Sequence, residues 1–328
     1  MPGTILIRDA TIVDGSGRRP FRGSILIMGD RIQEVVEGPS ARTGTADVVI
    51  DASGLIACPG FIDMHAHGDE TLFLYPTADN YVLQGVTTIV GGNCGFSPAP
   101  IRDWWLMSFW EYDWWHEIEP YKYYAPIMHP IEKVNEKLKE KLGFTIDWRT
   151  FGEYLQKIRE IGTSVNYVPM VGHNTIRTAV MGNDYKRRAR PEEVEEMRRL
   201  VREAMDSGAH GMSTGLDYEP GSYADTEELV ELARVVAEYG GIYATHIRGE
   251  GATLIQAVRE AIEIGEKAGV PVEISHHKAS GRANWGRVRQ TLRMMEEARE
   301  RGVDVTCDVY PYLSLIHISE PTRPRLIS

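Results

Sequence analysis

The sequence predicts an α/β fold: a (β/α)8 barrel of the TIM type, with about seven strands present, preceded by a small N-terminal β-domain. Short β-rich segments and turns fill the chain up to about residue 56. From residue 55 onward, strand-length apolar segments alternate with amphipathic helices, which is typical of βαβ units and a parallel sheet. Metal-binding residue types recur where successive strands end, as they do at the mouth of such a barrel. A doubly wound open sheet would instead concentrate its chemistry at one switch point.

The N-terminal β-domain is predicted for residues 1–56. Turn signals at Asp14-Gly15 and Gly29-Asp30 separate its strands. The β-rich segments are residues 5–7, 24–27 and 48–50.

The barrel is predicted for residues 57–312. Its helices begin with recognisable signals: Pro191 suits a first helical position, and Glu192 and Glu193 suit the positive end of the helix dipole. The clear helices are residues 191–207, 225–239 and 252–268. The candidate strands are residues 55–64, 86–91, 165–171, 208–214, 242–246, 270–275 and 303–308.

Residues 101–148 interrupt the alternation of strands and helices. The segment holds all but one of the seven tryptophans, and no strand or helix of the barrel is recognisable in it. Such a long excursion is either a lid or a packed subdomain. Two interpretations stay open: a satellite core of aromatic side chains, or an apolar wall over the active site.

Composition and charge narrow the class of protein. The chain has 328 residues and a net charge of −11, which argues against nucleic acid or an anionic membrane as partner. No apolar segment approaches the roughly 18 residues of a membrane span, and no signal peptide is visible. Three widely spaced cysteines argue against a disulfide framework, so we expect a cytoplasmic protein.

The most informative stretch is residues 60–69, where an apolar segment leads into His65-Ala66-His67. Residues two apart in a strand point to the same side, so His65 and His67 present two imidazoles together. Neutral imidazole is the commonest protein ligand of zinc and related metals. An isolated His-x-His is about as often a polar turn, so the residues downstream decide its meaning.

Further thiol and imidazole groups follow the later strands. Cys94 follows the second strand, His246 ends the fifth, and His276 follows the sixth with His277 beside it. A soft thiolate with imidazoles selects zinc-like metals, and a catalytic zinc keeps one position open for water. Each residue alone is more often structural, but together they predict a metal site. His173 and His277 stay ambiguous. Three histidines without strand-end context are treated as structural: His116, His129 and His210.

Several motifs carry a resemblance to known proteins. The pattern Pro-Gly-Phe-Ile-Asp-x-His-x-His at 59–67, after a small β-domain, resembles the amidohydrolase superfamily. Within it, five motifs resemble the D-aminoacylases (N-acyl-D-amino-acid deacylases), over residues from about 4 to 312. They are Gly-Asn-Cys-Gly at 92–95, Gly-Leu-x-Tyr-x-Pro-Gly at 215–221, Thr-His-x-Arg at 245–248, Ser-His-His-Lys at 275–278 and Asp-x-Tyr-Pro-Tyr at 308–312.

The resemblance implies residue roles. Cys94, His246 and His276 would hold a tightly bound Zn²⁺, and His65 and His67 a second, weaker metal. Cys94 would replace the carboxylated lysine that bridges the metals of most superfamily members. Metal-bound hydroxide would attack the amide of an N-acyl-D-amino acid, giving a carboxylate and a free D-amino acid. The groups that would meet the substrate carboxylate are Lys278, Arg248 and Tyr310.

One departure from the family pattern concerns the end of the chain. The family's general acid/base is an aspartate at the end of the eighth strand, and no such strand is recognisable here. Asp308 belongs to the seventh-strand motif, so the catalytic acid/base stays unknown. Residues 313–328 contain Pro321 and Pro324, lack helical periodicity, and resemble a translated sequencing-adapter fragment. We therefore expect a C-terminally truncated, nearly inactive chain whose tail is not native.

Three functions stay open at this point. Deacylation of small-molecule N-acyl-D-amino acids is favoured by the motifs around Cys94. Opening of a cyclic amide, as in hydantoinases and dihydropyrimidinases, uses the same chemistry. An inactive, truncated metal-binding fragment is the third, and the missing aspartate favours it.

Overall fold

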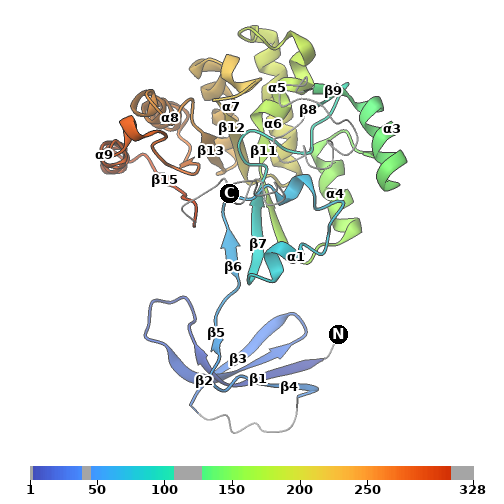
Figure 1. The fold of residues 1–328 in the computed structure, drawn as a ribbon, viewed down its shortest axis with the longest axis vertical. Helices are drawn as coiled ribbons and strands as arrows, with labels where there is room; N and C mark the ends of the chain where they lie inside the picture. Colours follow the sequence, from blue (N-terminus) through green and yellow to red (C-terminus); the bar gives the residue numbers. More distant parts are fainter. Residues whose placement is uncertain (1–2, 39–45, 107–127, 312–328) are drawn as a thin grey trace, which may run out of the picture. The chain divides into compact units, whose positions relative to one another are not determined.

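The computed structural model describes residues 3–38, 46–106 and 128–311 (Figure 1). The chain divides into two compact units, Met1–Phe61 and Ile62–Ser328. The predicted non-native tail, 313–328, lies outside the described residues. Throughout the described parts of the chain, no helix is both long and apolar enough to cross a membrane.

The N-terminal unit contains a five-stranded sheet in the order β3-β2-β1-β4, with β5 also pairing with β1. Its strands are β1 (Thr4–Ile12), β2 (Phe21–Met28), β3 (Arg31–Glu37), β4 (Val48–Asp51) and β5 (Ile56–Ala57). Gly29, with φ of 58°, allows the tight turn between the antiparallel strands β2 and β3. The sequence analysis did not recognise β3, because this edge strand carries charged and amide side chains among its few apolar ones.

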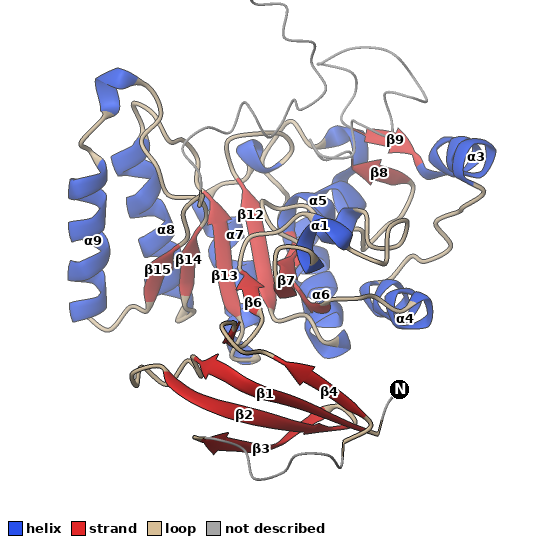
Figure 2. Ribbon diagram, turned by 60° about the horizontal axis from the view of Figure 1, so that its bottom comes forward, coloured by secondary structure: helices blue, strands red, loops and turns tan. Residues whose placement is uncertain are grey.

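The larger unit is built on strands that lie side by side in chain order (Figure 2). One sheet has the order β10-β7-β6 and the next β11-β12-β13-β14-β15, and only Met170 separates β10 from β11. The strands are β6 (Phe61–Asp63), β7 (Val86–Gly91), β10 (Asn166–Pro169), β11 (Val171–Gly172), β12 (Gly211–Gly215), β13 (Ile242–His246), β14 (Val272–Ile274) and β15 (Val305–Cys307). The pairings β7–β10 and β11 through β15 are parallel.

All seven predicted strand positions are therefore confirmed, and two of them are interrupted. The segment 55–64 splits into β5 and β6 on either side of Pro59, which has no N–H to donate to a sheet. Among the described residues, no eighth strand follows β15 to close a barrel. What the structure supports is an α/β fold with a sequentially ordered, largely parallel set of strands.

Helices follow the strands and pack on them through apolar faces. Helices α6 to α9 lie around the outside of strands β12 to β15 in both views (Figures 1 and 2). The main helices are α4 (Phe151–Ile161), α5 (His173–Met181), α6 (Pro191–Ser207), α7 (Thr226–Glu238), α8 (Leu254–Ala268) and α9 (Val288–Glu300). The predicted helix at 191–207 is confirmed at both ends. The helix predicted from residue 225 begins one residue later, because Asp225 is its N-cap and accepts the Glu228 N–H at 2.9 Å.

The segment 101–148 contains more structure than its sequence indicated. Its described part includes β8 (Trp104–Leu106), β9 (Met128–Pro130) and α3 (Ile131–Leu142). Trp148 is 1% exposed, donates its indole N–H to the Pro98 carbonyl at 2.8 Å, and packs on Phe73 and Tyr154. Trp105 and Trp148 thus belong to the core of the larger unit. Trp104 is partly buried and packs against the same core. The other three tryptophans of the segment, at 110, 114 and 115, lie outside the described residues.

Glu193, in the first turn of α6, gives a testable pH dependence. Its carboxylate pairs with Arg187 at 2.7 Å and with Arg190 at 2.5 Å, and the Arg187 hydrogen bonds are the main reason that the pKa of Glu193 falls to about 2. A carboxyl with a lowered pKa stabilises the fold above the pKa of the unfolded chain, about 4.3, and this contribution is lost as the pH falls towards 2.

We therefore expect the wild type to lose part of its stability advantage over Glu193→Gln as the pH falls from 6 to 3.5. Urea unfolding of both proteins at the two pH values measures this difference. Glu192→Gln, which removes a neighbouring but exposed carboxylate, is the matched control. A difference between wild type and Glu193→Gln that stays constant over this pH range would contradict the assignment.

Candidate metal centre

The predicted metal ligands converge at the carboxyl ends of four strands. His65 and His67 follow β6, Cys94 follows β7, His246 ends β13 and His276 follows β14. They form two groups, His65–His67–Cys94 and Cys94–His246–His276, and in each group the potential ligand atoms lie within 4.8 Å of one another. Cys94 belongs to both groups, so one thiolate lies between two possible metal positions.

Cys94 faces three imidazoles at short distances. Its Sγ atom lies 3.3 Å from Nε2 of His65, 3.6 Å from Nε2 of His276 and 3.9 Å from Nδ1 of His246. The thiol is only 6% exposed. Nitrogen and sulfur atoms at these separations can share one ion, because zinc bonds are about 2.0–2.3 Å long.

The turn that carries Cys94 is fixed by its neighbours. Gly92 and Cys94 both have positive φ, 78° and 54°, and a side chain at Gly92 would collide with the backbone carbonyl of Met170. The Tyr218 hydroxyl donates to the Cys94 carbonyl at 2.8 Å, and Ser213 Oγ accepts the N–H of the residue after Cys94 at 2.8 Å. Local backbone geometry therefore aims the thiol at the histidines.

The electrostatics of the centre favour a thiolate. Burial alone would raise the pKa of the Cys94 thiol, but hydrogen bonds from His246, His276 and His65 hold it well below its ordinary value. For His65, burial lowers the pKa, and the stronger combined effect of Asp308 and Cys94 raises it to about 9. A buried thiolate surrounded by imidazoles is a donor set that suits zinc, so these residues fit the metal that the sequence predicted.

Two carboxylates stand behind the imidazoles. Asp308 Oδ2 lies 3.2 Å from Nδ1 of His65, and Glu250 Oε1 lies 3.0 Å from Nδ1 of His276. The sequence analysis missed Glu250, although its position four residues after His246 was a usable signal. The contact between His65, which follows β6, and Asp308, which follows β15, brings the ends of these two strands together at the centre. The strands of the larger unit from β6 to β15 are therefore curled.

Two of the predicted substrate-binding residues lie beside the centre. Lys278 Nζ is 2.5 Å from Glu250 Oε1 and lies 5.2 Å from the centre of the Tyr310 ring. The Tyr310 ring stacks on the His276 ring at 5.7 Å. A cation and a phenol thus border one side of the His276 imidazole.

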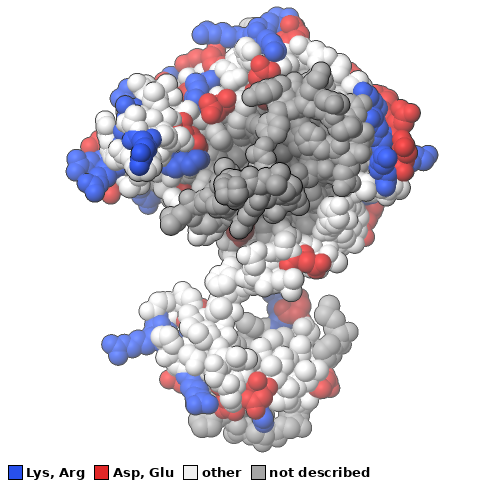
Figure 3. Space-filling model, in the orientation of Figure 1, with Lys and Arg blue, Asp and Glu red and all other residues white. Residues whose placement is uncertain are grey.

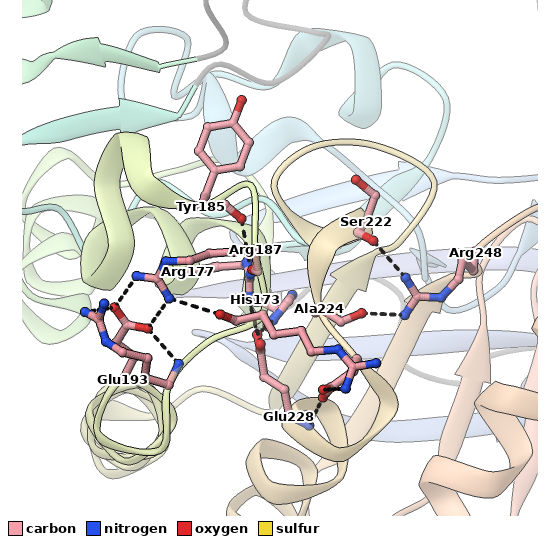
Figure 4. Close-up of polar contacts among 12 residues, drawn as sticks. His173, Arg177, Tyr185, Arg187, Glu193, Ser222, Ala224, Glu228 and Arg248 are labelled. Carbon is pink, nitrogen blue, oxygen red and sulfur yellow. Dashed lines mark hydrogen bonds and ion pairs between the residues drawn. The ribbon is translucent and has the colours of Figure 1, made fainter.

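Arg248 has a different environment from the one expected. Its guanidinium donates twice to Glu260, at 2.9 Å each. It also donates to the carbonyls of Ser222 and Ala224, at 3.1 and 3.0 Å (Figure 4). These contacts engage Nε, Nη1 and Nη2. Arg248 therefore fastens the loop after β12 to helix α8, and its contact with the substrate carboxylate stays a prediction.

The ambiguous histidines lie away from the ligand groups. His173 is fully buried, with Nε2 2.8 Å from Glu228, which also pairs with Arg177 (Figure 4). His277 has Nε2 2.8 Å from Thr291 Oγ1, and burial lowers its pKa. Of the histidines expected to be structural, His129 is buried in β9 and His210 precedes β12. The remaining one, at 116, lies outside the described residues.

Known protein sequences match most of the chain. The profile of the amidohydrolase family matches residues 48–326. A D-aminoacylase of Alcaligenes xylosoxydans xylosoxydans is 39% identical over 313 residues, which are 95% of this chain and 58% of that protein. An N-acyl-D-aspartate deacylase of the same organism is 36% identical over 324 residues, 98% of this chain and 59% of that protein. The chain thus spans less than two thirds of the length of these relatives.

Solved structures of similar proteins also superpose on most of the chain. A D-aminoacylase structure superposes with a TM-score of 0.77 at 36% identity, covering 94% of this chain and 58% of that one. An N-acyl-D-glutamate deacylase from Bordetella bronchiseptica, complexed with zinc and a phosphonate inhibitor, superposes with a TM-score of 0.78 at 32% identity and the same coverage. An L-hydantoinase from Arthrobacter aurescens, at 14% identity and a TM-score of 0.55 over 95% of this chain and 59% of that one, shares the fold alone.

Proposed function

Since the chain belongs to the amidohydrolase family, we propose that it hydrolyses the amide bond of N-acyl-D-amino acids in a zinc-dependent reaction. The products are a carboxylate and a free D-amino acid. The observation that carries the proposal is the buried Cys94 thiolate shared by two groups of histidines. The names of the similar proteins, D-aminoacylase and N-acyl-D-aspartate deacylase, supply the substrate class.

We propose the metal ligands residue by residue. Cys94, His246 and His276 hold one Zn²⁺ tightly, and His65 and His67, with Cys94, form a second and weaker position. The first group has the deeper burial, with Cys94 and His276 buried and His246 half-buried. When bound, zinc supplies a Lewis acid for the amide carbonyl and lowers the pKa of a water molecule.

The other residues around the centre have separate roles in binding the substrate and in holding the site together. Lys278 and Tyr310 bind the substrate carboxylate next to His276. Arg248 acts indirectly, by holding the loop that contains Tyr218 against Cys94. No described residue takes the place of the family's eighth-strand aspartate, so the general acid/base is left unassigned.

We also propose the domain organisation in which residues 1–56 form a small β-domain and residues 57–312 form strands of a (β/α)8 barrel. The contact of His65 with Asp308 supports a curled, barrel-like arrangement. The partner is a small molecule, and on the face drawn in Figure 3 the described Lys and Arg residues lie interspersed with Asp and Glu. A reducing cytoplasm suits a centre that depends on a free thiolate.

Substrate selectivity tests the proposal. The zinc-loaded protein is assayed with N-acetyl-D-amino acids, N-acetyl-L-amino acids and cyclic imides such as dihydrouracil. Because no described residue supplies the general acid/base, which typically contributes about 10²–10⁴ in rate, slow hydrolysis with a preference for the D-compounds is the expected result. Preferential ring opening would support the cyclic amidohydrolase, for which the shared fold is the only argument. Zinc-dependent binding of N-acetyl-D-amino acids without turnover would support the metal-binding fragment.

Lys278 gives a prediction about substrate affinity. Replacing it with Met removes a charge-assisted hydrogen bond, which contributes about 1.5–3 kcal/mol, so the KM should rise by roughly ten-fold or more while zinc content stays the same. Lys267→Met, which removes an exposed lysine paired with Glu227 and Glu263, is the control. If KM and kcat are both unchanged in Lys278→Met, the lysine does not bind the substrate.

A further inference from the structure

Each candidate metal position has a carboxylate of its own behind one of its histidines. His276 presents Nε2 to Cys94 Sγ at 3.6 Å and Nδ1 to Glu250 at 3.0 Å. His65 presents Nε2 to the same sulfur at 3.3 Å and Nδ1 to Asp308 at 3.2 Å. Both imidazoles therefore have one nitrogen towards the thiolate and the other towards a carboxylate oxygen, and Nδ1 of His276 also lies 3.1 Å from Nζ of Lys278.

We propose that Glu250 and Asp308 are positioning residues for two separate metal positions. Glu250 serves the Cys94–His246–His276 position, and Asp308 serves the His65–His67–Cys94 position. In both cases the carboxylate accepts the Nδ1 proton, which leaves the lone pair of Nε2 free and orients the ring. The assignment rests on the proposed function only for the identity of the five metal ligands.

Glu250 is rigidly placed for this role. Its side chain is 12% exposed and is held by Lys278 at 2.5 Å. Its backbone carbonyl accepts the Ser280 N–H at 2.8 Å, so the loops after β13 and β14 are tied together at this residue. Glu250 Oε1 is also 4.0 Å from Nε2 of His246, the other imidazole of the same group. The two imidazoles that Glu250 contacts, those of His246 and His276, thus belong to the same metal position.

Asp308 is anchored differently. Its Oδ1 atom accepts the backbone N–H of His276 at 2.6 Å, which leaves Oδ2 for the imidazole of His65. Its backbone N–H donates to Ile274 at 3.2 Å, and its carbonyl accepts the His277 N–H at 2.9 Å. The imidazole that the Asp308 side chain contacts, that of His65, therefore belongs to the other metal position, His65–His67–Cys94.

The test first disables one metal position by mutation, so that the other can be measured alone, and then removes each carboxylate. In the full chain, His67→Ala leaves the Cys94–His246–His276 group intact, and His246→Ala leaves the His65–His67–Cys94 group intact. Zinc affinity is measured in each background by competition with a chromophoric chelator. Loss of an outer-shell partner costs about 10–100-fold in metal affinity. Glu250→Gln should show that loss in the His67→Ala background and less than about three-fold in the other.

Asp308→Asn should show the opposite pattern. Asn keeps an oxygen for the His276 N–H but turns an NH₂ group towards Nδ1 of His65, which forces the tautomer that cannot use Nε2 as a ligand. Glu193→Gln, a carboxylate held by arginines in α6, controls for the loss of one negative charge. Equal losses in both backgrounds, reversed losses, or no loss for either variant would overturn the proposal.

A spectroscopic readout covers variants whose metal-free form does not fold. Protein produced with cobalt is examined for the thiolate-to-cobalt charge-transfer band and for the ligand-field bands. The charge-transfer band should persist because Cys94 is present, and the ligand-field bands should shift only when the carboxylate of the occupied position is removed. Unchanged ligand-field bands in both matched variants would also overturn the proposal. Neither measurement requires turnover, so a protein that shows this pattern without hydrolysing amides would refute only the proposed function.

Discussion

Replacing Cys94 with Ala is expected to remove tightly bound zinc. The thiolate is the one donor common to both ligand groups, so its loss weakens both metal positions at once. The decrease in affinity should exceed the roughly 100-fold that loss of an outer-shell partner costs. Metal analysis after dialysis against a chelator should find about one zinc per chain in the wild type and almost none in the variant.

Two matched variants sharpen this test. Cys307→Ala removes a half-buried thiol whose pKa is raised by burial and which belongs to neither group, so the zinc content should not change. His65→Asn removes a ligand of the weaker position alone and should leave most of the tight zinc. Equal zinc in the wild type and in Cys94→Ala would show that the thiolate is not a ligand.

Among the substitutions proposed for stability measurements, Glu228→Gln is expected to lower the free energy of unfolding most. Its carboxylate is 3% exposed and pairs with the fully buried side chains of Arg177 and His173 (Figure 4). Removing one partner of a buried ion pair leaves an uncompensated charge and typically costs about 3–5 kcal/mol. Urea unfolding of the full chain should show this decrease in the free energy of unfolding.

Glu231→Gln is the control for this loss. Glu231 lies on the same helix, α7, but its side chain is 38% exposed and pairs with an exposed arginine, Arg234. Exposed ion pairs contribute little, so this change should stay within about 0.5 kcal/mol. If Glu228→Gln is no more destabilising than Glu231→Gln, the buried cluster does not stabilise the fold as argued.

Local signals in the sequence determined the elements and the candidate ligands. The start of α6 at Pro191 and its end at Ser207 follow from a proline, first-turn acids and a following glycine, all within a few residues of the boundary. The strands were recognisable as short apolar segments, and the histidines and Cys94 stood out because they follow those segments directly. Such features depend on near neighbours in the chain, so a single sequence contains them.

The partners of these residues were decided only by the tertiary structure. Asp308 meets His65 across 243 residues, and Glu250 meets His276 after a strand and a helix have intervened. Arg248 could be recognised as a cation after β13, and only the fold places Glu260 and two loop carbonyls within reach of its guanidinium. A side chain binds whichever oppositely charged or hydrogen-bonding group packing brings within about 3 Å, and that choice depends on how strands far apart in sequence are set side by side.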